Sequence, residues 1–138
     1  MIKLFQTLYK NYQNKRNLKQ IKKDPFSIQY INNPTEDQQL LAISQYAHLI
    51  KYIQNPSIEL QLQAISQNPY TIQYIQNPSI ETQNQAVKRF GCTIQYIKNP
   101  SLQIIETALN NTIECKEFIK INHLSIEEQN YLRLKYEI

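Results

Sequence analysis

Apolar and polar residues follow one another in a pattern that repeats along the chain every 22 residues. Four Asn-Pro pairs mark this period, and the copies that they open cover residues 33–54, 55–76, 77–98 and 99–120. In the second copy, apolar residues at helical spacing predict one face of a long helix over residues 56–67. Residues 70–76 carry a shorter apolar face. Each copy is therefore predicted to form one long and one short helix.

The Asn-Pro pairs are predicted to start helices. A residue before proline favours extended backbone, which suits the residue that caps a helix at its N-terminus. Proline fits the first helical position because its missing N–H would have no partner there. We therefore predict that the long helices are capped by Asn33, Asn55, Asn77 and Asn99. Asn68, which precedes Pro69, is predicted to start a short helix in the same way.

The positions that recur most closely predict a core shared between copies. One small residue returns in every long helix and marks where neighbouring helices approach most closely, at Ala42, Ala64, Ala86 and Ala108. Paired isoleucines on the short helices complete a continuous core, at Ile28/Ile31, Ile50/Ile53, Ile72/Ile75 and Ile94/Ile97. An aromatic residue beside each pair is interpreted as a structural ladder in preference to a base-stacking one, at Tyr30, Tyr52, Tyr74, Tyr96 and Phe118.

Both ends depart from the repeat. Residues 11–32 are a degenerate first copy, residues 1–12 predict an amphipathic capping helix, and residues 121–138 predict a C-terminal cap with a helix over 125–134. Atypical ends are what stacked repeats need to cover their terminal faces. The chain, residues 1–138, is thus predicted to be a single all-α repeat domain: a right-handed α-solenoid (superhelix) of 22-residue two-helix repeats with N- and C-terminal capping helices.

Over residues 18–119 the pattern resembles helical repeats of the Armadillo and HEAT type, and more closely the short two-helix repeats of the leucine-rich-repeat-variant kind. It is also similar to viral and phage repeats built on Asn-Pro and Tyr-Ile. Where HEAT-like repeats carry an arginine ladder, this chain has Gln39, Gln61 and Gln83, then Ile105. We expect these amides to form hydrogen bonds across repeats to the Asn-Pro turns. The resemblance implies a binding scaffold whose short helices line the concave surface.

Composition excludes several function classes. The single glycine, Gly91, rules out glycine-rich phosphate-binding loops and nucleophile elbows. No apolar run is long enough for a signal peptide or a membrane span, so we expect a protein of the cytoplasm, of the cell or of an infected host, with no membrane partner. Cys92 and Cys115 lie about one repeat apart, which is too far for a disulfide, and both are expected to be reduced.

Stacked repeats place equivalent side chains in rows, whereas a catalytic centre needs different functional side chains close together. Asp37, Glu59 and Glu81 form such a row, about one helix spacing apart, and are interpreted as favouring the positive helix ends. His48 and Cys92 occupy the same place two repeats apart, beyond the reach of one metal ion. We therefore expect no enzyme activity, with no catalytic residue, cofactor or metal site.

Positive charge is concentrated at one end. Residues 1–24 carry a net charge of +6, whereas the rest of the chain carries −2. This basic end offers candidate contacts to phosphates or to an acidic surface at Lys10, Lys15, Arg16, Lys19, Lys22 and Lys23. The repeats themselves lack the basic stripe of a nucleic-acid groove. A solvated cap is the plainer interpretation of the same charges.

The polar positions beside the isoleucine pairs recur along the short helices and form the candidate partner-binding ridge: Gln29, Asn32, Lys51, Gln54, Gln73, Gln76, Gln95, Lys98 and Lys120. Ordinary solvation of this face is the alternative. The sequence favours a non-enzymatic scaffold that binds another protein and occupies or blocks its surface. Its bias toward Asn, Gln, Ile, Lys and Tyr suggests an AT-rich genome, of a low-GC bacterium, its phage or another virus. Together with the similarity to viral repeats, this makes a phage or viral inhibitor of a host immune complex the special case of this expectation. The alternatives are nucleic-acid binding through the basic end, and a homo-oligomer; the oligomeric state is left open.

Overall fold

The computed structural model describes residues 2–138, and no β-strand occurs among them. The predicted all-α class is confirmed. The α-helices are α1 (Ile2–Lys23), α2 (Glu36–Gln45), α3 (Ile58–Gln67), α4 (Ile80–Arg89), α5 (Leu102–Asn111) and α6 (Ile126–Tyr136). Between them lie the 3₁₀ helices η1 (Pro25–Tyr30), η2 (Ala47–Tyr52), η3 (Pro69–Tyr74), η4 (Gly91–Tyr96) and η5 (Ile113–Phe118).

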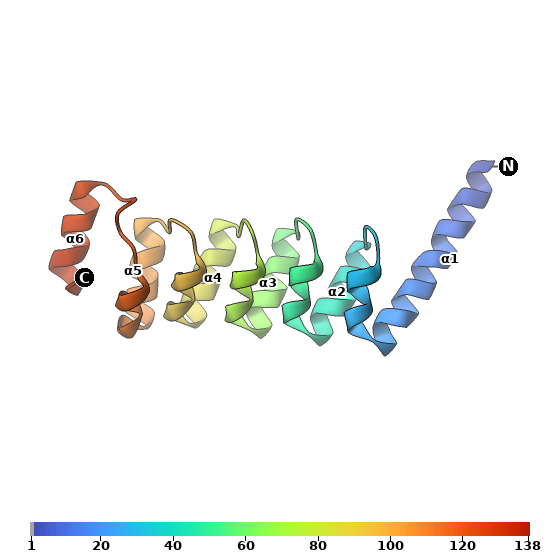
Figure 1. Cartoon of the computed structure of the whole chain (residues 1–138), viewed down its shortest axis with the longest axis horizontal. Helices are drawn as coiled ribbons and strands as arrows, with labels where there is room; N and C mark the ends of the chain where they lie inside the picture. The colour runs from blue at the N-terminus through green and yellow to red at the C-terminus, as the bar shows by residue number, and fades with distance from the viewer. Residues whose placement is uncertain (1) are drawn as a thin grey trace.

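The helices pack in chain order and form a single row with α1 at one end and α6 at the other (Figure 1). Each of α1 to α4 contacts the next α-helix, and each of η1 to η4 contacts the next 3₁₀ helix. The row therefore has an α layer and a 3₁₀ layer. This arrangement puts the corresponding residues of neighbouring copies side by side.

The long helices start two residues later than the sequence predicted. Their N-caps are Thr35, Ser57, Ser79 and Ser101, and in the last three the serine hydroxyl accepts a hydrogen bond from a backbone N–H of the first turn. Asn33, Asn55 and Asn99 instead have φ of 52°, 49° and 50°. The prediction that Asn33, Asn55, Asn77 and Asn99 cap the long helices is wrong. Asparagine tolerates left-handed backbone, and here it turns the chain between the two layers.

The same residue type does cap a 3₁₀ helix. The Asn68 side chain accepts a hydrogen bond from the backbone N–H of Tyr70, and Pro69 is the first helical residue, as the sequence predicted. The short element is a 3₁₀ helix that ends at Tyr74, two residues before the end of the predicted range 70–76. Thr71 is 1% exposed and its hydroxyl donates to the Asn68 carbonyl. Ile72 within η3 and Ile75, which follows it in extended backbone, are both buried in the core.

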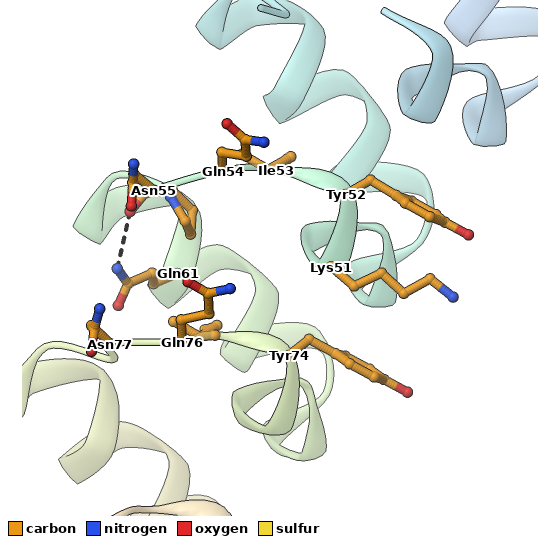
Figure 2. Close-up of a pocket in the computed structure, with 11 residues that line it drawn as sticks. Lys51, Tyr52, Ile53, Gln54, Asn55, Gln61, Tyr74, Gln76 and Asn77 are labelled. Carbon is orange, nitrogen blue, oxygen red and sulfur yellow. Dashed lines mark hydrogen bonds between the residues drawn. The ribbon is translucent and has the colours of Figure 1, made fainter.

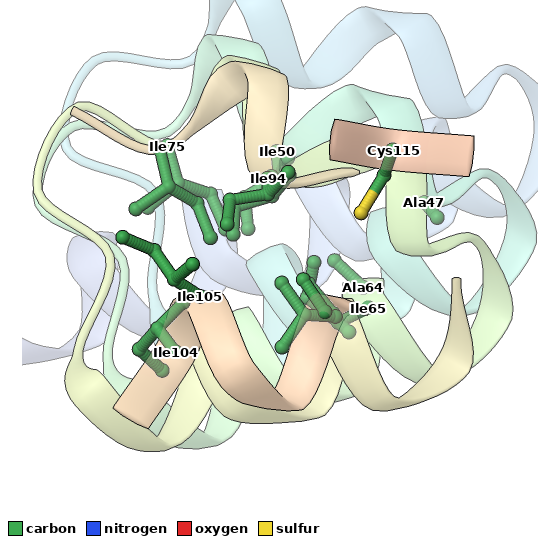
Figure 3. Packing of buried hydrophobic residues seen from close by; sticks show 14 of the residues in the cluster. Ala47, Ile50, Ala64, Ile65, Ile75, Ile94, Ile104, Ile105 and Cys115 are labelled. Carbon is green, nitrogen blue, oxygen red and sulfur yellow. The ribbon is translucent and has the colours of Figure 1, made fainter. Parts of the chain in front are cut away.

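The core lies between the two layers (Figure 3). The four recurring alanines are 0% exposed, which confirms that they mark a closely packed position. The expected continuous core is divided, however: Ile21, Ile28, Ala42 and Leu49 form a small cluster under α1, and a larger cluster runs from Ile43 to Leu132.

The two ends differ. A capping helix over residues 1–12 was expected before a copy over 11–32, and residue 1 lies outside the described residues. The described part shows one unbroken helix, α1, whose first three turns are exposed. At the other end α6 behaves as a cap: Ser125 and Glu128 form a capping box, and Leu132 is fully buried.

Gly91 has a packing role in this fold. A Cβ added there would lie 2.4 Å from the carbonyl oxygen of Ala108 and 2.8 Å from the Cβ of Thr112. The Gly91 N–H also donates to the side-chain oxygens of Asn111 and Thr112, at 2.9 and 3.2 Å. The end of α5 can therefore rest directly on the start of η4 only because position 91 has no side chain.

We expect Gly91→Ala to lower the free energy of unfolding by about 1 to 3 kcal/mol, because the new methyl group forces α5 away from η4. Chemical denaturation measures this loss. Ala47 begins η2 in the same way that Gly91 begins η4, so Ala47→Ser serves as a control with a smaller expected effect. A Gly91→Ala protein as stable as the wild type would contradict the close contact.

Candidate partner-binding surface

The candidate surface is built where each 3₁₀ helix ends. Ile53 and Ile75 follow η2 and η3 in extended backbone, with φ of −102° and −97°. Successive side chains of an extended segment point to opposite sides. Both isoleucines are buried in the core, and Gln54 and Gln76, which follow them, are exposed. Tyr52, the last residue of η2, is half-buried and packs against the smaller core cluster.

Three hollows lie between neighbouring copies on this surface, and we call them the inter-repeat hollows. The largest, about 650 Å³, is lined by residues 51–56, by Gln61 and by residues 74–77. Figure 2 shows Tyr52 and Tyr74 side by side along one part of it, with Gln54 and Gln76 along another. A second hollow of about 490 Å³ adjoins it toward α1, and a third of about 240 Å³ lies toward α6.

The structure places most of the predicted ridge at these hollows. All nine predicted partner-binding residues are exposed. Eight of them line an inter-repeat hollow: Gln29, Asn32, Lys51, Gln54, Gln76, Gln95, Lys98 and Lys120. Gln73 is not among the lining residues, and its Nε2 donates instead to the carbonyl of Tyr70.

Two kinds of lining residue were missed by the sequence reasoning. Tyrosines were assigned to a structural ladder, but Tyr30, Tyr52 and Tyr74 line the two larger hollows and Tyr30 is 79% exposed. The turn residues Asn33, Asn55, Asn77 and Asn99 also line hollows. The signal for the tyrosines is their recurrence as the last residue of η1, η2 and η3, directly before an isoleucine in extended backbone.

The hollows are polar, and two of the three carry positive charge. Lys51, Lys98 and Lys120 line them, and within residues 2–138 no carboxylate does. The Lys51 Nζ lies 4.8 Å from the centre of the Tyr52 ring, which is the geometry of a cation–π contact. Carboxamides supply both donors and acceptors here. Such a surface suits peptide groups and carboxylates.

The predicted glutamine row lies beside the Asn-Pro turns, and two of its members, Gln39 and Gln61, line the two larger hollows. Gln39, Gln61 and Gln83 each donate from Nε2 to the proline carbonyl of their own copy, at 2.7, 3.0 and 3.0 Å. The Asn-Pro turns were therefore correctly predicted as partners. Bonds across repeats are found for Gln61, whose Oε1 accepts from the Ser79 N–H and the Thr82 hydroxyl. For Gln39 and Gln83 the turn bonds stay within one copy.

One copy lacks the glutamine, and another residue takes its place. Ile105 is fully buried and has no amide, and the Pro100 carbonyl lies instead 2.7 Å from Nε2 of His123. A carbonyl only accepts, so Nε2 carries the proton in this contact. At the C-terminal end Gln129 donates to the carbonyl of Leu124 at 2.9 Å.

The basic residues lie elsewhere, on α1. All six predicted contacts are exposed. At about 100° per helical residue, Lys15, Arg16, Lys19, Lys22 and Lys23 fall within an arc of about 120°, whereas Lys10 points to the opposite side. Among residues 2–138 the only salt bridge joins Lys135 to Glu106, at 2.9 Å. The five residues therefore form one basic face without ion-pair partners.

The candidate catalytic and metal-binding residues stay apart. Asp37, Glu59 and Glu81 are exposed in the first turns of α2, α3 and α4. In the described part of the chain, no three His, Cys, Asp or Glu residues gather where they could hold a metal ion. None of its helices is long and apolar enough to cross a membrane.

No protein family model, curated protein or solved structure matches the chain. The likeness to Armadillo and HEAT repeats is therefore one of sequence pattern. The structure adds an all-α row of helices that pack in chain order, which is compatible with a solenoid.

The hydrogen bonds of the glutamine row predict unequal effects for two similar substitutions. Gln61→Leu leaves the Pro56 carbonyl and the Ser79 N–H without partners and removes one of the two side-chain partners of the Thr82 hydroxyl. Gln83→Leu leaves only the Pro78 carbonyl. We expect a loss of about 2 to 4 kcal/mol for Gln61→Leu and about 1 kcal/mol for its matched control Gln83→Leu. Urea denaturation of the two variants checks the order. Equal losses would show that the cross-repeat bonds add nothing.

The cysteines predict a difference in thiol reactivity. Burial raises the pKa of Cys115 to about 11, and the thiol is 0% exposed. Burial, and then the charge of Glu114, also raise the pKa of the half-buried Cys92 thiol. Because the thiolate is the reactive form, a thiol reagent at neutral pH should modify Cys115 only after unfolding. Mass spectrometry of the labelled native protein tests this, with urea-unfolded protein as the control.

Proposed function

We propose that this chain is a non-enzymatic scaffold that binds another protein through the inter-repeat hollows, and that it acts by occupying or blocking that protein's surface. The observation that carries the proposal is the largest hollow, where Lys51, Gln54 and Gln76 meet two tyrosines. Carboxamides and two tyrosines return at the neighbouring hollow nearer α1, which has no lysine. A surface built by repetition suits a partner that is itself extended.

The chemistry of the hollows favours a peptide segment. Carboxamides match the donors and acceptors of a peptide backbone, and tyrosine rings offer apolar faces beside a hydroxyl. Packed helices lie about 9 to 10 Å apart, which is the length of about three residues of extended chain. One segment running along the row could therefore present similar groups to successive hollows. The lysines favour a segment with acidic side chains.

The proposal has a finer form, which rests on sequence pattern and composition. In it the row is a right-handed superhelix of 22-residue, Armadillo-like repeats, and the chain is a phage or viral inhibitor of a host immune complex. It then works in the cytoplasm of the infected cell. The inhibitor acts by covering a surface that the host complex needs, since binding alone is enough for that effect.

We expect Lys51→Ala/Gln54→Ala/Gln76→Ala to lose a protein partner that the wild type retains. The wild type is used as bait in nuclease-treated host extract, retained proteins are identified by mass spectrometry, and affinity is then measured with the purified partner. Removing three hollow-lining side chains should weaken binding by at least about tenfold, because contacts in the middle of an interface dominate its affinity. Circular dichroism should be unchanged, since all three side chains are exposed.

The matched control is Gln85→Ala/Lys88→Ala/Gln103→Ala, which removes one lysine and two glutamines from exposed positions of α4 and α5. These residues do not line the hollows. The control variant should bind as the wild type does. Equal losses in the two variants, or undiminished binding by the hollow variant, would refute the proposal.

Nucleic-acid binding through the basic face of α1 is the second candidate. It is favoured by five exposed basic residues in one arc without ion-pair partners. Replacement of Lys15, Arg16, Lys19, Lys22 and Lys23 by glutamine should then abolish retention of nucleic acid. The wild-type affinity for nucleic acid should also fall steeply as the salt concentration rises, because protein binding releases cations from the phosphates and added salt opposes that release.

A further inference from the structure

Helix α1 extends well beyond the copies that it packs against (Figure 1). Its C-terminal half holds the fully buried Ile21 and the partly buried Leu18. The Asn14 carboxamide oxygen accepts hydrogen bonds from the side chains of Gln38 and Thr35 in and before α2. Residues 2–12, by contrast, are all exposed. The first three turns of α1 therefore have no packing partner among residues 2–138.

These turns are rich in large apolar side chains. Exposed fractions are 76% for Ile2, 64% for Leu4, 67% for Phe5, 56% for Leu8, 66% for Tyr9 and 64% for Tyr12. At about 100° per residue, all six fall within an arc of about 160°. Ile21, Leu18 and Asn14, which meet the repeats, lie on nearly the opposite side. The apolar face of residues 2–12 is thus turned away from the protein that carries it.

A face of this kind is costly for a lone chain. Its six side chains expose on the order of 600 Å² of apolar surface, at the upper end of the largest patch found on typical monomers. An isolated helix of about eleven residues is also marginally stable in water, because helices in proteins owe most of their stability to packing. Both facts call for a partner that covers residues 2–12.

The character of this face changes along α1. Beyond Tyr12 the same side of the helix carries Lys15, Arg16, Lys19, Lys22 and Lys23. If two such helices paired in parallel, the five basic residues of one would lie beside the five of the other, and their charges would repel. An antiparallel pairing brings the two apolar halves together and leaves each basic half beyond the end of the partner helix.

We propose that residues 2–12 of two copies pack together as an antiparallel helix pair, which makes the protein a dimer. Burial of this face on both copies removes about 1,200 Å² in total from water, which reaches the lower end of the range for specific protein interfaces. A two-fold axis passes near Leu8, the middle of the exposed apolar set 4–12, so that Leu4 of one copy meets Tyr12 of the other. Each copy's row of inter-repeat hollows then extends away from the central pair.

Sedimentation equilibrium of the wild-type chain from micromolar to hundreds of micromolar concentration tests the dimer. We expect twice the chain mass, and a dissociation constant raised by more than about a hundredfold in Phe5→Gln/Leu8→Gln, because each copy loses two buried apolar side chains. Circular dichroism should show that the repeats remain folded. The control Lys19→Gln/Lys23→Gln changes the same face outside the pair and should stay dimeric.

Disulfide trapping in a Cys92→Ala background tests the direction of the pair. On oxidation, the cysteines at position 8 of the two chains should form a disulfide with each other in the Leu8→Cys variant. Leu4→Cys should not cross-link, since about 12 Å of helix rise separates the two Leu4 positions. The double variant Leu4→Cys/Tyr12→Cys should cross-link through the unlike positions. A cross-link by Leu4→Cys alone would overturn the antiparallel arrangement.

Other occupants of this face give different results, and each overturns the proposal. A wild-type chain that is monomeric throughout excludes the dimer. Masses that grow without limit indicate end-to-end association, for example of α1 with α6. A monomer that is retained by phosphatidylserine vesicles, and that Phe5→Gln/Leu8→Gln releases, indicates a lipid surface. A dimer that survives Phe5→Gln/Leu8→Gln places the contact elsewhere.

Discussion

Each turn between the layers leaves a backbone carbonyl that must find a donor, and the rest of the row depends on how this is met. The carbonyl belongs to the residue before the N-cap of a long helix. A glutamine five residues later donates to it in three copies and again at Leu124. This bond ties the start of the α-helix to the extended segment before it. The distance between the two layers follows from that tie.

The exception shows how strong the constraint is. Position 105 is buried among apolar side chains and holds isoleucine, so the fourth copy has no amide to offer. The Pro100 carbonyl is nevertheless satisfied, because His123 reaches it from the segment that follows. An unpaired buried carbonyl costs about as much as a lost hydrogen bond. The chain thus supplies the donor from the C-terminal cap while it keeps the apolar core.

The sequence predicted what depends on periodicity and missed what depends on competing local preferences. Burial of Ala64 and Ile65 follows from helical spacing and was predicted. The conformation of Asn55 was not, because the extended preference before proline and asparagine's tolerance of left-handed backbone point to different turns. A pair of isoleucines three apart fits both an α-helix and a 3₁₀ helix. The buried Thr71 hydroxyl, bonded to the Asn68 carbonyl, accompanies the tighter form.

The candidate site was predictable in part for the same reason. Polar positions beside the isoleucine pairs were found from their recurrence, and most of them line hollows. The tyrosines were not included in the candidate site because their position beside the isoleucine pairs was interpreted as a structural ladder next to the core. The exposed face of residues 2–12 was within reach of the sequence: counting helical turns from Leu4 to Ile21 already sets the two on different sides. Only the structure shows that α1 continues without a break between them.

The charges of α1 and of the hollows act separately. Electrostatic effects between exposed groups fade within about 8 to 10 Å at physiological salt, which is about one helix spacing. The basic face of α1 therefore affects the first hollow, lined by Gln29 and Asn32, far more than the hollow lined by Lys98 and Lys120. A partner that binds the far hollows is recognised by the lysines and amides of those hollows. In the proposed dimer, pairing through α1 doubles the number of hollows in one assembly and so raises the avidity for a partner. It does not alter what each hollow recognises.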